Sequence, residues 1–323
     1  MKYIYNKSND PYWNLATEEY LLTQRDDEIF MLWVNSDVIV VGRNQNTMAE
    51  INYEYVTENN IAVVRRMTGG GAVFHDKGNL NFTFIENNSS NLDFAYFGNI
   101  IIGALKAIGI TAELSGRNDL TIDGKKFSGN AATIHKNRRL HHGTLMLSTP
   151  ADRLTKALKV DPKKIEGKGI KSVLSRVTNI NAHLSAPLDI DGLINVIFNH
   201  VKNLSDIEIS DFTNEDILKI SALSDEKYRK WEWNYGRSPK YNFSKSQKFP
   251  AGLIEVKTTV LNGIIEDLNV YGDFFGIRDA GEFSSLLKGC RHDRIAISEI
   301  LDDPIVSECF FGITKHELLE VLI

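Results

Sequence analysis

Cysteine is nearly absent from this chain, whose 323 residues include only Cys290 and Cys309. Two cysteines near one end of so long a chain cannot build the disulfide framework of a small secreted domain, and they fit a reducing compartment. The segment Met1–Asn6 lacks the apolar core of a signal peptide, and no apolar run approaches the length of a membrane span. The sequence therefore predicts a cytoplasmic protein with no membrane partner.

An excess of positive charge is also missing. The chain carries 37 Lys and Arg against 42 Asp and Glu, a formal net charge of −5, which leaves no basic footprint for nucleic acid. The common phosphate-binding loops are absent as well, because neither GxxxxGK[ST] nor GxGxxG occurs. Gly167-Lys168-Gly169 lacks both a third glycine and a preceding strand. We therefore expect no nucleic-acid partner and neither of these two loops.

The most informative stretch that is present joins two arginines to three consecutive glycines. Arg65 and Arg66 follow the apolar run Ile61–Val64, which predicts a buried strand, and Gly69–Gly71 come next. Glycines let a backbone approach a ligand and expose its N–H groups, and arginine suits phosphate and carboxylate oxygens. Together they predict a strand that ends in an anion cradle, although a surface turn with two solvated arginines has the same pattern.

A second informative stretch surrounds Lys126. Asp123-Gly124 is a hairpin-turn dipeptide, so Lys126 should lie early on the returning strand. The small residues Ser128 and Gly129 follow it and leave room for a ligand. The residues alone do not distinguish a ligand-binding Lys126 from a solvated hairpin lysine, because Lys125 lies beside it.

Hydrophobic periodicity predicts an α/β catalytic domain. Helices are expected over 11–25, 93–108, 152–159 and 191–204, and strands over 29–34, 38–41 and 80–85, with strands dominating from 110 to 147. The strands over 29–34 and 38–41 are expected to pair across Asn35–Asp37.

A domain boundary is expected near residues 236–250, where polar and turn residues break the periodicity. It divides the chain into a large domain over 1–240 and a small one over 241–323. In the small domain, Asn262-Gly263 between two apolar runs predicts a hairpin, and helices are expected near 280–288 and 315–322. Trp231 and Trp233 are expected to anchor one domain on the other rather than to stack on bases.

Taken in order, these motifs resemble the lipoate–protein ligase family, within the wider biotin and lipoate protein ligase superfamily. The matching stretches are Arg65–Asn79 (RRxxGGGAVFHDxGN), Gly42–Asn46, Asn118–Leu120, Lys126 with Ser128-Gly129, His141–Leu145 and Lys168–Val173. The resemblance covers most of the chain. It implies an α/β (α+β) protein with a large mixed-sheet catalytic domain of the biotin/lipoate ligase type and a small α/β C-terminal accessory domain.

The resemblance also implies two half-reactions. Free lipoate and ATP, with Mg²⁺, would give lipoyl-AMP and pyrophosphate, and a lysine amine of an acceptor protein would then attack the adenylate to give an amide and AMP. The expected acceptors are the lipoyl domains of 2-oxo-acid dehydrogenase E2 subunits, the glycine-cleavage H protein, or both. The residues do not choose between these acceptors or between lipoate and octanoate.

The family pattern assigns roles to individual residues. Lys126 is expected to face the α-phosphate, and Asp119 to position the attacking amine or the metal, whose ligands otherwise stay unassigned. The expected contacts with ATP and lipoyl-AMP are Arg66, Gly70, Gly71, Ala72, Val73, Phe74, Lys126, Ser128 and Gly129. The expected lipoate pocket consists of Leu15, Arg43, Val73, His142, Gly143 and Thr144. For His75, His141 and His142 a structural role is the more common one.

Two other functions stay open on this fold: a lipoyl or octanoyl transferase that uses a preformed adenylate or acyl-protein, and a non-catalytic lipoate sensor. Related transferases carry the acyl group on a cysteine thiolate, and neither cysteine lies among the motifs, which favours the ATP-dependent route.

The chain has Ala131-Ala132-Thr133 where some relatives carry an arginine near the ligand. The basic residues Lys163, Lys164, Lys168, Lys171 and Arg176 form either a solvated surface or a contact for an acidic nucleotide or acceptor.

Overall fold

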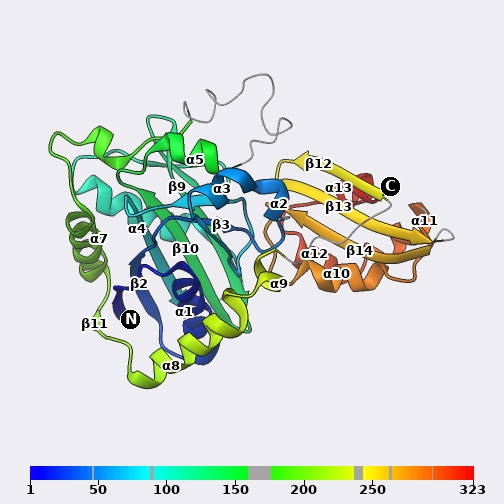
Figure 1. Ribbon diagram of the computed structural model, residues 1–323, viewed down its shortest axis with the longest axis horizontal. Coiled ribbons are helices and arrows are strands. Elements are labelled where there is room, and N and C mark those ends of the chain that lie inside the picture. Colours follow the sequence, from blue (N-terminus) through cyan, green and yellow to red (C-terminus); the bar gives the residue numbers. More distant parts are fainter. Residues whose placement is uncertain (46, 88–90, 159–175, 236–242, 262–263, 293) are drawn as a thin grey trace.

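The computed structural model describes residues 1–323 except 46, 88–90, 159–175, 236–242, 262–263 and 293. The described residues form a large body built on a mixed sheet and a smaller body at the C-terminal end of the chain (Figure 1). This confirms the predicted fold class. Among these residues, no helix is both long enough and apolar enough to cross a membrane.

The large sheet has the strand order β11-β1-β2-β6-β10-β9-β8-β7. Its strands are β1 (Lys2–Asn6), β2 (Ile29–Val34), β6 (Asn79–Glu86), β7 (Glu113–Ser115), β8 (Asp119–Ile122), β9 (Lys125–His135), β10 (Arg138–Met146) and β11 (Glu208–Ile209). The strand β1 is parallel to β2 and β11, whereas the other pairs are antiparallel. The predicted strand-rich stretch from 110 to 147 corresponds to β7 through β10.

A second sheet lies over the large one and has the order β4-β3-β5. Its strands are β3 (Val38–Val41), β4 (Ala62–Arg65) and β5 (Val73–His75). The predicted pairing of 29–34 with 38–41 is wrong, because β2 pairs with β1 and β6 while β3 pairs with β4 and β5. Every residue of β2 and β3 is buried, so neither strand has the polar alternation that would indicate its neighbours.

Helices surround both sheets. They are α1 (Pro11–Gln24), α2 (Thr47–Glu50), α3 (Tyr53–Glu58), α4 (Phe94–Lys106), α5 (Ala151–Ala157), α7 (Ile190–Leu204), α8 (Asn214–Leu223) and α9 (Trp231–Asn234), with the 3₁₀-helix η2 (Ile180–His183) and the π-helix η3 (Ser224–Tyr228). The four predicted helices correspond to α1, α4, α5 and α7. Asp10, Asp93 and Asp189 cap α1, α4 and α7 by accepting a hydrogen bond from a first-turn N–H.

Apolar cores cover the two faces of the large sheet. On one face, α4 and α7 pack through Phe97, Ile101 and Ile197. On the other face, Leu15 of α1 and Val40 of β3 pack with Trp33 of β2. The helix α1 and the small sheet therefore share this second face, and the candidate site opens between them and the large sheet.

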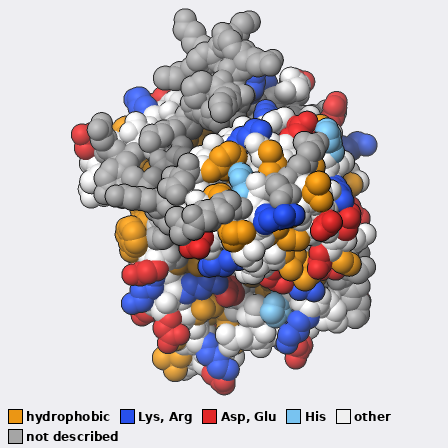
Figure 2. All heavy atoms as spheres, turned by 90° about the vertical axis from the view of Figure 1, so that its right-hand side faces the viewer, with side chains coloured by type: hydrophobic (Ala, Val, Ile, Leu, Met, Phe, Trp, Pro, Cys, Tyr) orange, Lys and Arg blue, Asp and Glu red, His pale blue; other side chains and the backbone are white. Residues whose placement is uncertain are grey.

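The C-terminal body contains an antiparallel sheet and helices packed on one of its faces. Its elements are β12 (Phe243–Phe249), β13 (Gly252–Leu261), β14 (Ile264–Gly272), α10 (Ala280–Leu287), α11 (Arg294–Ile300), α12 (Pro304–Cys309) and α13 (Lys315–Leu322). The antiparallel pairing of β13 with β14 confirms the predicted hairpin, and α10 and α13 confirm the two predicted helices. Figure 2 views the molecule from this end, where acidic and basic side chains are intermixed with small apolar areas.

Several predictions about the chain's organisation concern residues outside the described ranges. The predicted boundary between 1–240 and 241–323 lies within the gap at 236–242, so it stays a prediction. Of the basic segment, Lys163, Lys164, Lys168 and Lys171 also lie outside, and only Arg176 is described. The expectation that Trp231 and Trp233 anchor one domain on the other differs from what these contacts show. Trp233 donates its indole N–H to the carbonyl of Arg65 and so anchors α9 on β4 within the large body, whereas Trp231 is 64% exposed.

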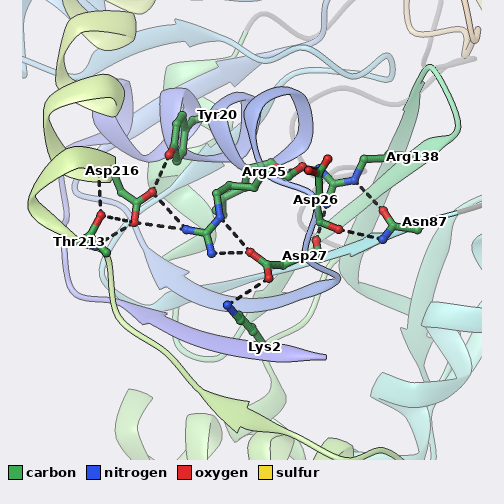
Figure 3. Close-up of polar contacts among 10 residues, drawn as sticks. Lys2, Tyr20, Arg25, Asp26, Asp27, Asn87, Arg138, Thr213 and Asp216 are labelled. Carbon is green, nitrogen blue, oxygen red and sulfur yellow. Dashed lines mark hydrogen bonds and ion pairs between the residues drawn. The ribbon is translucent and has the colours of Figure 1, made fainter.

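A polar network secures the C-terminal end of α1 (Figure 3). Arg138 of β10 donates to the carbonyl oxygens of Leu21 and Leu22 at 2.8 Å each, and so satisfies carbonyl groups that a helix end leaves unpaired. Arg25 pairs with Asp27 and with Asp216 of α8. These contacts hold α1, β10 and α8 together behind the candidate site.

Asp216 makes the stability of this network depend on pH. Its burial opposes ionisation, but hydrogen bonds from Tyr20 and Thr213 and the charge of Arg25 outweigh that effect and hold the pKa of Asp216 at about 2. Because the folded pKa lies below the ordinary value of 3.8, the stabilisation is present above about pH 4 and disappears as the pH falls toward 2.

We expect Asp216→Asn to lower the free energy of unfolding by about 2 kcal/mol at pH 7 and to remove that much of the acid dependence between pH 4 and 2. Urea titrations of both proteins across this range would measure it. Glu215→Gln is the matched control, since Glu215 is the adjacent carboxylate and is 75% exposed at its side chain. An equal loss in both variants would contradict the assignment.

Candidate active site

A cavity of about 110 Å³ opens between the two sheets of the large body. Its lining combines an apolar part with a small number of polar groups, as binding sites for small molecules usually do. The lining residues are Leu15, Trp33, Val40, Arg66, Gly70, Gly71, Ala72, Val73, His75, Asn81, Asn118, Lys126, Gly129, Asn130, Ala131, His142, Gly143 and Thr144.

Most residues that the sequence singled out meet at this cavity. From the glycine stretch come Arg66, Gly70, Gly71, Ala72 and Val73, from β9 come Lys126 and Gly129, and from α1 and β10 come Leu15, His142, Gly143 and Thr144. Residues far apart in the chain therefore share one site.

Four other predicted site residues do not line the cavity. Asp119 adjoins it through an ion pair with Lys126. Ser128 is buried and accepts a hydrogen bond from Asn130, while Phe74 packs in a separate apolar core. Arg43 turns away to Asp279, the N-cap of α10, with Nη2 2.6 Å from the carboxylate. The geometry therefore gives no support to a pocket role for Arg43.

The cavity also contains residues that the sequence did not single out for the site. Trp33 and Asn81 oppose each other on β2 and β6, and both line the cavity from strands to which the sequence analysis gave no role in the site. The sequence does contain a pattern that could have identified Asn81: the polar residues Asn79, Asn81 and Thr83 alternate with apolar residues along β6. Such alternation inside a buried strand indicates a face that meets something other than the apolar core.

Arg66 shapes the glycine loop. Its Nη2 donates to the carbonyl oxygens of Gly69 at 2.6 Å and Gly71 at 2.9 Å, and its Nη1 donates to Val40. Gly70 between them has φ of +93°, and a Cβ there would lie 2.9 Å from Arg66 Nη2, so the loop requires glycine at this position. Burial lowers the pKa of Arg66 to about 10, which leaves the guanidinium charged at neutral pH.

Arg65 has a different role from its neighbour, because successive residues of a strand point to opposite sides. It is fully buried and donates to the carbonyl oxygens of Gly42 at 2.9 Å and Gln45 at 2.7 Å, and to Thr47 Oγ1 at 2.7 Å. Of the two arginines in the expected anion cradle, Arg66 lines the cavity, whereas Arg65 holds the turn that begins at Gly42.

Lys126 projects over Gly129 at the cavity. Its Nζ lies 2.7 Å from Asp119 Oδ1, and a Cβ on Gly129 would lie 3.1 Å from that Nζ. A register shift between Leu120 and Thr121 interrupts the pairing of β8 with β9 beside Lys126, and such bulges commonly redirect a side chain. The Lys126 side chain is 38% exposed, so a ligand can reach it.

The histidines differ in their surroundings. His75 lines the cavity, and burial, with the nearby charge of Arg66, lowers its pKa to about 3, so it is neutral. Its Nδ1 accepts from Asn35 Nδ2 at 3.1 Å, while its Nε2 has no partner among the described residues. His141 is buried among Phe82 and Phe97, away from the cavity lining. His142 lines the cavity and contacts Glu18 and Thr68.

The C-terminal body contacts the glycine loop from outside. The ring of Phe275 lies 3.5 Å from the position of a Cβ on Gly70, and a Cβ on Gly69 would lie 2.4 Å from the carbonyl oxygen of Phe274. Arg117 stacks on Phe275, with its guanidinium 4.1 Å from the ring centroid. The two consecutive glycines thus allow a close approach between the two bodies at the edge of the cavity.

The described residues contain no cluster of three or more His, Cys, Asp or Glu side chains that could hold a metal ion by themselves. Mg²⁺ that arrives with nucleotide phosphates needs only one or two protein carboxylates. Asp119, the acidic partner of Lys126, is a carboxylate next to the cavity lining.

Comparison with known proteins agrees with this geometry. Residues 10–202 match the model of the lipoyl protein ligase A/B catalytic domain, and residues 238–322 match that of the bacterial lipoate protein ligase C-terminus. The chain is 44% identical to lipoate–protein ligase 1 of Staphylococcus aureus and 43% identical to lipoate-protein ligase LplJ of Bacillus subtilis, in each case over 100% of both chains.

Solved structures show the same relationship. Plasmodium falciparum LipL1 in complex with lipoate has a TM-score of 0.81 at 27% identity and covers 94% of both chains. A lipoate-protein ligase A bound with ATP has a TM-score of 0.64 at 25% identity, covering 73% of this chain and 98% of that one. A bipartite ligase from Thermoplasma acidophilum, described with its E2 lipoyl domain, has a TM-score of 0.66 at 27% identity, covering 75% and 98%.

Proposed function

The chain belongs to the lipoyl protein ligase A/B family and is a lipoate–protein ligase, and we propose that it joins free lipoate to AMP in the cavity between its two sheets before transfer to an acceptor lysine. One observation carries this site assignment: the Lys126 ammonium and the glycine loop held by Arg66 line the same partly apolar cavity. That combination suits an acyl chain that ends in a carboxylate beside a nucleotide phosphate.

In the first half-reaction, a carboxylate oxygen of lipoate attacks the α-phosphorus of ATP and pyrophosphate leaves. Negative charge accumulates on the phosphate oxygens in the transition state, and a fixed cation lowers its energy. We assign this role to Lys126 because its Nζ lies at the cavity. The backbone N–H groups from Gly70 to Val73, on the loop whose carbonyls Arg66 holds, are the proposed hydrogen-bond donors to the nucleotide.

The apolar lining is the proposed pocket for the acyl chain. Leu15, Val40 and Val73 contribute aliphatic surface, and Trp33 and Ala131 complete it. The neutral His75 and the amide of Asn81 add polar groups to this lining. Apolar surface around the acyl chain would displace water that could otherwise hydrolyse an acyl-adenylate.

In the second half-reaction, the amine of an acceptor lysine attacks the carbonyl carbon of the adenylate, the amide bond forms, and AMP leaves. Asp119 is the proposed group that positions the amine or contacts Mg²⁺ carried by the nucleotide, since its carboxylate is 2.7 Å from Lys126 Nζ. Mg²⁺ would supply further positive charge to the phosphates of ATP.

Changing Asp119 to asparagine should slow lipoyl transfer by about tenfold or more, because the amide keeps the shape but removes the charge beside Lys126. Single-turnover transfer from preformed lipoyl-AMP to a lipoyl domain would measure this. Asp123→Asn is the control, since Asp123 is 81% exposed at its side chain in the adjoining turn. Unchanged transfer by Asp119→Asn would remove Asp119 from the proposal.

A cysteine-based transferase is the alternative that the structure disfavours. Cys309 is fully buried in the C-terminal body, and burial raises its pKa to about 11, so its thiol is protonated at neutral pH. Cys290 also belongs to that body, and neither cysteine lines the cavity. A thioester route would need a thiolate at the cavity.

The decisive test is pyrophosphate release by the purified protein with ATP, Mg²⁺ and free lipoate, in the absence of any acceptor. A ligase gives a lipoate-dependent burst of pyrophosphate and retains lipoyl-AMP. A transferase gives no pyrophosphate but accepts preformed lipoyl-AMP or an acyl-protein, and a sensor binds lipoate without turnover. Either of these last two results would overturn the proposed activity.

The proposed acceptors are lipoyl domains of 2-oxo-acid dehydrogenase E2 subunits and the glycine-cleavage H protein. The archaeal relative described with its E2 lipoyl domain supports a lipoyl domain as the class of acceptor. A cytoplasmic location remains our prediction from the sequence.

A further inference from the structure

Glu18 is a buried carboxylate that does not line the cavity. It lies on α1, has no exposed surface, and is contacted by His142 and Thr83. Each of its two oxygens is 2.9 Å from His142 Nδ1, and Oε1 accepts from the hydroxyl of Thr83 at 2.6 Å. A buried charge is costly unless partners compensate it, so this position requires an explanation.

Beyond His142, the hydrogen-bond chain continues to the glycine loop. His142 Nε2 lies 2.8 Å from Thr68 Oγ1, and Arg66 Nε donates to the same oxygen at 2.9 Å. Arg66 then donates to the carbonyl groups of Gly69 and Gly71. Four side chains therefore connect α1 to the loop that lines the cavity.

The hydrogen bonds that connect Arg66 to Glu18 can all run in the same direction, from donor to acceptor. A guanidinium can only donate, so Thr68 accepts from Arg66 and is free to give its own hydrogen to His142 Nε2. His142 Nε2 is then an acceptor, and its proton sits on Nδ1, facing a carboxylate that can only accept. Every group in the chain is satisfied by this arrangement.

The charges balance as well. The buried guanidinium of Arg66 faces the carboxylates of Glu18 and Asp273 and the second cation of Arg65. Arg65 is surrounded by carbonyl oxygens, which solvate it locally. Two buried cations, Arg65 and Arg66, already lie in this region, and the hydrogen-bond arrangement above needs only one proton on the His142 ring.

We propose that Glu18 is a positioning residue for the nucleotide, which acts by fixing the Nδ1–H tautomer of His142 and, through Thr68, the orientation of Arg66 and its glycine loop. This inference rests on the proposed function, because it assigns the loop to ATP. Replacing Glu18 should therefore raise the KM for ATP more than the KM for lipoate.

The test compares Glu18→Gln with Glu19→Gln. A glutamine at 18 keeps the size but replaces one of the two oxygens that face His142 Nδ1 with an NH₂ group. This should weaken the preference for the Nδ1–H tautomer and raise the share of the Nε2–H tautomer, whose N–H would be a second donor to Thr68. ¹⁵N NMR of the histidine rings should show that tautomer change, and the KM for ATP in pyrophosphate release should rise about tenfold or more, with the KM for lipoate changing far less.

Glu19→Gln is the matched control. Glu19 is the next residue of α1 and binds Lys227 and Tyr228, away from the cavity, so this variant should keep both the His142 tautomer and the KM for ATP of the unmodified protein. Activity of the unmodified protein tests the proposed function itself, so its failure is distinguishable from a failure of the positioning role.

Thr68→Val separates the relay from general damage to α1. It removes the hydroxyl but leaves Glu18 facing His142, so the KM for ATP should rise as in Glu18→Gln while the Nδ1–H tautomer is retained. The proposal is overturned if unmodified His142 is an imidazolium or an Nε2–H tautomer. It is equally overturned if Glu18→Gln raises only the KM for lipoate, which would make Glu18 a part of the acyl pocket alone.

Discussion

Replacing Lys126 with alanine should reduce the rate of lipoyl-adenylate formation by at least about a hundredfold, the scale seen when one fixed donor to a developing charge is removed. Its ammonium, which lies at the cavity over Gly129, would no longer face the α-phosphate. The fold should remain intact, because the side chain is 38% exposed and its ion-pair partner Asp119 is 36% exposed. Pyrophosphate release with lipoate and ATP, alongside circular dichroism, would measure both effects.

Lys125→Ala is the matched control. Lys125 is the preceding residue of β9, is exposed, and does not line the cavity, since successive strand residues face opposite ways. Its replacement should leave the adenylation rate within about twofold of the starting value. Similar losses in the two variants would mean that surface charge near the hairpin, not a specific contact of Lys126, supports the reaction.

Replacing Arg65 with methionine should lower the free energy of unfolding by about 3–5 kcal/mol, the cost of breaking a buried charged network. Methionine fills similar space but leaves the carbonyl oxygens of Gly42 and Gln45 and the hydroxyl of Thr47 without this donor. The turn beginning at Gly42 also packs on Gly70, whose carbonyl oxygen would lie 1.9 Å from a Cβ on Gly42. Activity should therefore fall together with stability.

Arg153→Met serves as the comparison for this effect. Arg153 also belongs to the large body and pairs with Asp37, but its side chain is 31% exposed. Partly exposed ion pairs contribute about 1 kcal/mol or less, so this variant should unfold in urea close to the unmodified protein. If Arg65→Met were equally mild, the hydrogen bonds of Arg65 would contribute little to holding the turn.

Much of the site could be predicted from short stretches of sequence. Three features of the site depend only on residues close together in the sequence: the arginine and glycine stretch, the Asp123-Gly124 turn and the position of Lys126 after that turn. Glycines and turn dipeptides restrict the backbone within a few residues, so a short stretch is enough to predict them. The same holds for the hairpin of β13 and β14 and for the helices α1, α4 and α7, whose periodicity and caps are local. The resemblance to lipoate–protein ligases supplied the activity, and the family match confirmed it.

Other features depend on distant residues. The residue types of β2 and β3 do not indicate that the two strands belong to different sheets. Both strands are buried throughout, so neither shows an alternation of polar and apolar residues. Arg43 belongs to a matching motif, yet its guanidinium binds Asp279, a residue 236 positions away. The contact of Phe275 with the glycine loop likewise exists only because the C-terminal body lies against it.

The sequence by itself determined the kinds of groups at the site: a glycine loop beside an arginine, a hairpin lysine and an apolar surround, since these follow from local backbone restriction and residue chemistry. Tertiary structure decided which of them face the ligand. Arg65 and Arg66 are adjacent, but their side chains point to opposite sides of the small sheet. Arg65 binds the turn that begins at Gly42, and Arg66 lines the cavity. Glu18 and His142, 124 residues apart, form their contact only after α1 has packed against β10. Contacts between distant residues depend on the packing of whole elements, which no local pattern encodes.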